Sequence, residues 1–229
     1  RNNRVVHFAH FGVLAGTGHM FLGNHFFLGD GETAGIRRAG LVFTKPNSNV
    51  FITGNYIDNC FIELSNEHDD SPTYASQYSF GGLTITGNLF IASDVAPWFR
   101  WLVVTPRGTG HFLNGITVTS NVFRVVGASI DRIEMADTTY AGLNYQSFRN
   151  VTFAHNTFHG VTQPTISPLL IEHVQNTAAD TWVVDGAAFL PFASRARNVT
   201  SVMPEGAVTN AANVAQFVQP YAMPGQGVA

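Results

Sequence analysis

The chain has 229 residues, and only 12% of them are charged, about half the usual share in a soluble domain. Its 22 glycines, 10 prolines, 19 phenylalanines and single lysine, Lys45, exclude helical bundles and coiled coils, which are rich in Ala, Glu, Lys and Leu. The formal net charge of -3 leaves no excess of Lys and Arg to neutralise phosphates, so we expect no nucleic-acid partner. The composition favours β-structure in one domain.

The chain carries no sequence signal for a membrane anchor. Its longest apolar runs are far shorter than the roughly 18 residues that cross a bilayer, so we expect no membrane insertion. Cys60 is the only cysteine, which excludes an internal disulfide framework without fixing the compartment. Because the first residue is Arg1 rather than Met, we expect a processed chain or a piece of a longer one.

One motif recurs along the chain: a short apolar stretch, a small residue, an asparagine and a second apolar stretch. Its copies span residues 21–26, 50–57, 83–90, 116–123 and 151–158. The asparagines at positions 24, 55, 88, 121 and 156 are 31, 33, 33 and 35 residues apart. Apolar residues alternate within each copy, which is the period of a strand. The spacing therefore predicts stacked β-coils rather than helical repeats of similar length.

The bend in each copy predicts two stacks of side chains. Gly and Asn tolerate a left-handed backbone, and stacked asparagine amides would form a ladder. After the bend, we expect Ile57, Phe90, Phe123 and Phe158 to lie one above another in the interior. Polar excursions from the coils are expected at 66–80, 105–114 and 136–150, where turn-forming and polar residues gather.

The repeat resembles the right-handed parallel β-helix of the pectate-lyase-like superfamily, including proteins related to family 28 glycoside hydrolases and β-helical spikes of phage-like particles. The resemblance covers about residues 5–190 and implies an all-β solenoid of five or six coils. We expect this β-helix over residues 1–191. Residues 192–229 lack the repeat and form an irregular C-terminal cap or tail.

A second strand follows each bend, with copies at 61–64, 101–104, 132–135 and 170–173. If Ile62, Leu102, Ile133 and Ile171 point inward, alternation predicts outward positions for Glu63, Glu134 and Glu172, beside Trp101 and Arg132. Rungs about 4.8 Å apart would separate Glu63 from Glu134 by roughly 9.6 Å. That separation is near the range of about 6.5–9.5 Å in inverting glycosidases.

This outer face predicts a polysaccharide groove. Glu134 and Glu172 are candidate catalytic residues, while Glu63, Trp101, Arg132 and Arg100 are candidate substrate contacts. The alternative is a solvated β-face on which Arg132 pairs with its carboxylate neighbours.

The family 28 resemblance adds Asp69 and Asp70 as candidate catalytic residues, in the place of that family's Asp pair. Gly110-His111 and Arg132-Ile133 resemble two further motifs, although Phe112 and Glu134 replace their last residues. The alternatives for Asp69 and Asp70 are a hydrated loop or a cation-binding loop. A polyuronate lyase would need Ca²⁺ on such carboxylates and a base such as Arg100 or Arg132, whereas otherwise no cofactor or resident metal is expected.

The expected function is an extracellular, cell-surface or particle-surface β-helix that binds polysaccharide, as part of a spike that is a candidate homotrimer. A polysaccharide-cleaving enzyme, either a glycoside hydrolase or a polyuronate lyase, is the alternative. A purely structural or adhesive module is the third option. The sequence does not identify the glycan.

Overall fold

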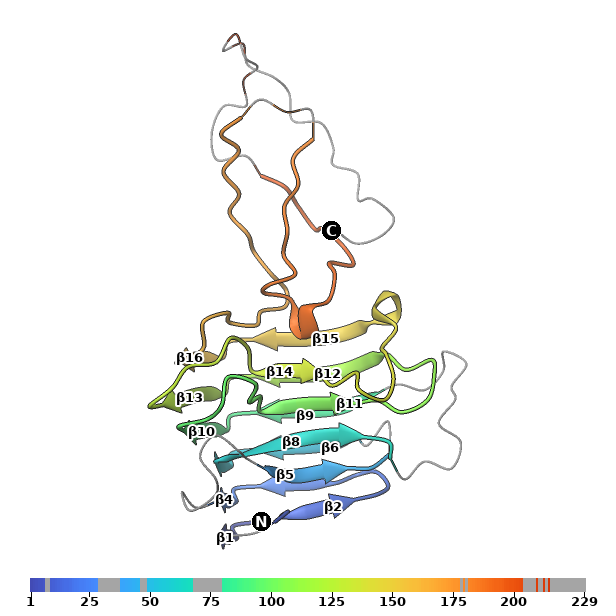
Figure 1. Cartoon of the computed structure of the whole chain (residues 1–229), viewed down its shortest axis with the longest axis vertical. Helices are drawn as coiled ribbons and strands as arrows, with labels where there is room; N and C mark the ends of the chain where they lie inside the picture. The colour runs from blue at the N-terminus through green and yellow to red at the C-terminus, as the bar shows by residue number, and fades with distance from the viewer. Residues whose placement is uncertain are drawn as a thin grey trace.

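The computed structural model describes residues 1–6, 9–28, 38–45, 49–67, 80–177, 179, 181–203, 209, 212 and 214. Within them the protein is an all-β solenoid of three parallel sheets (Figure 1). Sheet A stacks β1 (Arg4–Val6), β4 (His25–Phe27), β7 (Tyr56–Asp58), β10 (Leu89–Ser93), β13 (Val122–Val126) and β16 (Thr157–His159). Sheet B stacks β2 (Gly12–Leu14), β5 (Arg38–Phe43), β8 (Cys60–Ser65), β11 (Leu102–Thr105) and β14 (Glu134–Ala136). Sheet C stacks β3 (Met20–Leu22), β6 (Val50–Thr53), β9 (Phe80–Thr86), β12 (Leu113–Thr119) and β15 (Arg149–Ala154).

The chain passes through sheets B, C and A in turn, so each strand pairs with the strand one turn away. The predicted β-solenoid is confirmed, and it makes about four turns rather than the expected five or six coils. The difference arises after β16, because residues 170–173, expected as a further strand copy, hold no strand. Two single-turn 3₁₀ helices, η1 (Tyr145–Ser147) and η2 (Pro191–Ala193), are the helical elements of the described residues.

The asparagine ladder is confirmed at the corner between sheets C and A. Asn88 illustrates the bonding: its backbone N and Nδ2 both donate to Oδ1 of Asn121, at 3.0 and 2.9 Å. Its own Oδ1 accepts the same two bonds from Asn55, both at 2.9 Å. The ladder includes Asn3, which the repeat search missed and which donates to Asn24. Because these amides are mostly buried, each bond satisfies a polar group that water cannot reach.

The interior stack is also confirmed. The ring of Phe123 lies parallel to that of Phe90 at 4.7 Å and to that of Phe158 at 5.8 Å. Ile57 continues the column one rung below Phe90. Burial of this column, with the inward aliphatics of the three sheets, supplies the hydrophobic stabilisation of the solenoid.

Close stacking of the coils explains why residue 81 is a glycine. Gly81 in β9 pairs in register with Asn114 in β12. A Cβ atom on Gly81 would lie 1.5 Å from the backbone oxygen of Asn114, so only glycine fits there.

Beyond sheet C the chain forms the C-terminal extension, residues 169–203, which rises past β15 along the long axis of the molecule (Figure 1). It returns to the solenoid at η2, where buried Phe192 packs edge-on against Phe153 of β15. Strands of the described residues end at His159, and the division expected at residue 191 stays a prediction. No helix in the described part of the chain has the length and apolarity of a membrane span.

Candidate functional site

The register of sheet B decides which predicted site residues face outward. Leu102 pairs with Ile62 on one side and with Glu134 on the other. Glu134 therefore points inward and is 1% exposed, so its predicted outward position is wrong. The shift arises at Ile133, whose carbonyl accepts from the N–H groups of both Trp101 and Leu102. This local irregularity turns Ile133 and Glu134 inward together, and the predicted outward pair of Glu63 and Glu134 does not form.

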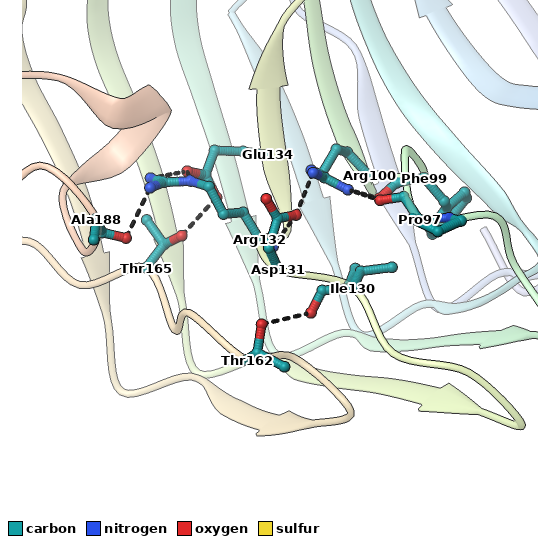
Figure 2. Close-up of polar contacts among 10 residues, drawn as sticks. All are labelled: Pro97, Phe99, Arg100, Ile130, Asp131, Arg132, Glu134, Thr162, Thr165 and Ala188. Carbon is teal, nitrogen blue, oxygen red and sulfur yellow. Dashed lines mark hydrogen bonds and ion pairs between the residues drawn. The ribbon is translucent and has the colours of Figure 1, made fainter.

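Glu134 instead lies at the centre of a buried polar cluster at the end of the solenoid (Figure 2). Its Oε1 accepts from Nε and Nη2 of Arg132 at 3.0 and 2.7 Å, and from the backbone N of Phe192 at 2.9 Å. Its Oε2 accepts from the hydroxyl of Thr165 at 2.6 Å. The carboxylate is thus fully occupied by protein donors, as a buried charge must be.

Arg132 extends this cluster to the C-terminal extension. Its Nη1 donates to the carbonyl of Ala188 at 2.8 Å, and its Nη2 donates to the carbonyl of Leu190. We call Arg132, Glu134 and Thr165 the cap latch, because their bonds fasten η2 over the last coil. The expected pairing of Arg132 with a carboxylate neighbour occurs, but in the interior rather than on a solvated face.

Arg100 lies beside the cap latch and forms an ion pair with Asp131 (Figure 2). Its Nη1 donates to the carbonyls of Pro97 and Phe99 at 2.7 and 2.6 Å. Burial lowers the pKa of Arg100, and the carboxylate of Asp131 opposes that change. These bonds fix the segment between β10 and β11, so Arg100 has a positioning role in this arrangement.

The other predicted residues do not join one groove. Trp101 is buried and packs against Phe99 and Phe123. The prediction that it faces outward and contacts substrate is therefore wrong. Glu172 is exposed on the C-terminal extension, and the strand at 170–173 on which it was predicted to face outward does not form. Asp69 and Asp70 lie outside the described residues. Of the predicted set, the structure brings together Arg100, Arg132 and Glu134.

Glu63 is the predicted carboxylate that does face outward on sheet B. It lies in a column of in-register side chains: Val13, Val42, Glu63, Val103 and Met135. Its Oε1 accepts from the hydroxyl of Thr105 at 2.9 Å. Partial burial raises the pKa of Glu63, the Thr105 bond opposes this, and the charges of Glu67 and Asp137 add to the rise.

The segment that leaves β11 places a cation, Arg107, beside this column, where it meets an aromatic ring from the segment that leaves β14. The guanidinium of Arg107 lies 3.5 Å from a carboxylate oxygen of Glu67 and 3.9 Å from the ring centre of Tyr140. Buried Asn66 holds the backbone of Arg107 from both sides: Oδ1 accepts from its N at 2.7 Å, and Nδ2 donates to its O at 2.9 Å. This fixed backbone presents the Arg107 side chain in one place.

Aromatic rings border sheet B at both margins. Tyr140 is 59% exposed in the segment that leaves β14, and Trp98 is 51% exposed in the segment that enters β11. We call the Val13–Met135 column, with Thr105, Arg107, Tyr140 and Trp98, the lateral face. Sequence reasoning placed Thr105 and Tyr140 in excursions but gave neither a role. Their partners are set by how loops of unequal length fold back, which no repeat spacing encodes.

Comparison with known proteins adds no assignment. No protein-family model, curated protein or solved structure matches this chain. The resemblance to the pectate-lyase-like superfamily therefore rests on the repeat motif. Among the described residues, no three His, Cys, Asp or Glu side chains are grouped so that they could hold a metal ion.

Proposed function

We propose that this protein binds polysaccharide along the lateral face of its β-solenoid. The observation that carries the proposal is the half-buried carboxylate of Glu63 in an otherwise apolar column, bordered by the exposed rings of Tyr140 and Trp98. Sugars offer both apolar ring faces and hydroxyl groups. Aromatic rings pack against the former, and a carboxylate accepts hydrogen bonds from the latter.

The shape of the face suits a polymer. The column has one residue at every rung, about 4.8 Å apart, so it runs along the axis of the solenoid. Val42 is buried within it, while Glu63, Val103 and Met135 are partly exposed. The mixture of Glu63, Glu67 and Asp137 with Arg107 carries no strong excess of positive charge, which favours a neutral glycan over a polyanion. A relation to pectate-lyase-like proteins, and a secreted or particle-surface setting, belong to this proposal.

Affinity electrophoresis or calorimetry across a panel of soluble polysaccharides tests it. Tyr140→Ala and Trp98→Ala are each expected to weaken binding about 3- to 10-fold, because each removes a stacking ring. Phe51→Ala is the matched control, since Phe51 is 38% exposed on β6 of sheet C, outside this face and outside the C-terminal extension. Equal binding by all three variants and the wild type would remove the lateral face from recognition.

A polysaccharide-cleaving enzyme is the second candidate, and the raised pKa of Glu63 favours it. A carboxylic acid whose pKa is raised keeps its proton to higher pH and can donate it to a glycosidic oxygen. In an inverting hydrolysis, Asp137 or Glu67 would then take a proton from the attacking water. Wild type that releases reducing ends, with loss of release but retained binding in Glu63→Gln, would establish the enzyme. Binding without any product would limit the function to recognition.

A further inference from the structure

Large apolar side chains gather on the C-terminal extension. Leu170 is 90% exposed, Val174 is 76% exposed and Met203 is 82% exposed. Trp182, Val183 and Val202 are each about half exposed. Isolated exposed apolar residues are ordinary, but several on one short segment mark an interaction surface. Together these six side chains expose on the order of 700 Å², close to the roughly 800 Å² that each partner contributes to a stable interface.

The backbone of residues 169–185 also lacks backbone pairing within the described chain. Among the described residues from 160 to 203, no strand is present. Among the described residues, no backbone N–H of 169–185 donates to another backbone carbonyl. Apolar side chains on an unpaired backbone gain most from a partner that both covers the side chains and bonds the backbone.

Charge identifies the kind of partner. Residues 169–190, the acidic limb, contain Glu172, Asp180 and Asp185 and no Lys or Arg. Residues 191–203, the basic limb, contain Arg195 and Arg197 and no Asp or Glu. Glu172, Asp185, Arg195 and Arg197 are all exposed. A second copy of the chain therefore offers each limb a surface of opposite charge.

We infer that the C-terminal extension is a self-association surface, on which the acidic limb of one copy packs against the basic limb of the next in a closed symmetric oligomer. The cap latch fixes the base of the extension on the solenoid, and the extension that carries these apolar residues rises past the last coil (Figure 1). Homo-oligomers close through repeated identical contacts, and the homotrimer expected from the sequence is one such assembly. The lateral face takes no part in this contact.

Light scattering after gel filtration, or sedimentation velocity, measures the assembly of the whole chain. Wild type is expected at a fixed multiple of the protomer mass, and Leu170→Asp with Val174→Asp is expected at the protomer mass. Val126→Asp is the control, because Val126 is 42% exposed on β13, far from the extension in sequence. Circular dichroism shows that each variant keeps its β-structure, so a loss of mass is not a loss of folding.

Charge exchange tests which limbs meet. Glu172→Arg and Arg195→Glu are each expected to weaken association, more so at low salt, and the double variant is expected to recover part of it. Wild type at the protomer mass at every soluble concentration would overturn the inference, even if another molecule bound the extension. An oligomer that Val126→Asp dissociates and Leu170→Asp with Val174→Asp leaves intact would overturn it too.

Discussion

The asparagine ladder and the cap latch solve the same physical problem in two ways. Both satisfy polar groups away from water, the ladder with neutral amides repeated at each coil and the latch with one ion pair at the end. In the ladder each amide bonds its copies one rung away, so the loss of one member breaks only the bonds to its two neighbours and leaves the other rungs intact. The latch has no copy, and all of its bonds depend on two side chains. In the ladder the stabilisation is divided among many residues, whereas in the latch it depends on Arg132 and Glu134 alone.

Breaking the latch is expected to have the largest effect on stability. Glu134→Ala leaves the Arg132 guanidinium, the hydroxyl of Thr165 and the N–H of Phe192 without their buried acceptor. Removal of one partner of a buried ion pair costs about 3–5 kcal/mol. We expect a fall of this size in the free energy of unfolding, measured by urea titration. Arg124→Ala, at an exposed charged residue of β13, should leave it unchanged, and equal effects of the two variants would contradict the latch.

Removal of a ladder amide in the middle of the solenoid is expected to lower the free energy of unfolding less than removal of the latch does. Asn88→Ala removes the acceptor of two bonds from Asn55 and the donor to Ile52, at a cost of about 2–3 kcal/mol. Asn156→Ala, at the last rung, should cost about 1 kcal/mol, because Asn156 is partly exposed. Thermal unfolding of both variants measures the difference. Equal losses at the two positions would show that burial does not set the strength of the ladder.

On the lateral face, the contribution of Glu63 to the free energy of unfolding is expected to depend on pH. Its pKa is raised in the folded state, so the folded protein holds this proton more tightly than the unfolded chain does. Its stabilising contribution is complete below the unfolded pKa of about 4.3 and is lost as pH rises through the folded pKa. The free energy of unfolding of wild type should therefore fall relative to that of Glu63→Gln as pH rises above about 4.3 and passes through the folded pKa. Parallel urea curves at every pH would contradict this expectation.

The smallest effect is expected from the exposed ion pair of Glu67 and Arg107. Both side chains are about one-third exposed, so water and salt screen their attraction. Glu67→Gln should change the free energy of unfolding by about 0–1 kcal/mol, and less in high salt. A larger, salt-independent loss in urea titration would mean that the pair is held as firmly as the latch.

The sequence predicted the ladder because a repeated device leaves a repeated signal. Asn55, Asn88 and Asn121 stand at one position of every coil, and their spacing alone indicates that they stack. Glu63 could likewise be placed outward from strand alternation. The latch left no such signal. Glu134 looked like another copy of Glu63, and only the irregularity at Ile133 reverses the direction of its side chain.

The rest of the lateral face depends on loops, which is why the sequence did not reveal it. Arg107 and Tyr140 are about one coil apart in the chain and meet because Asn66 fixes the backbone at Arg107. A unique contact between segments of unequal length has no second copy with which to align. The predictable part of this molecule is therefore its scaffold, and the less predictable part is the chemistry attached to it.

The ladder also gives the solenoid a polarity. From Asn3 to Asn121, every amide donates to Oδ1 of the asparagine in the following coil, so these amide-to-amide bonds all point the same way. Such aligned bonds polarise and strengthen one another. An inverted coil would set donor against donor or acceptor against acceptor. Coils can therefore be added or exchanged between such proteins only in a head-to-tail sense.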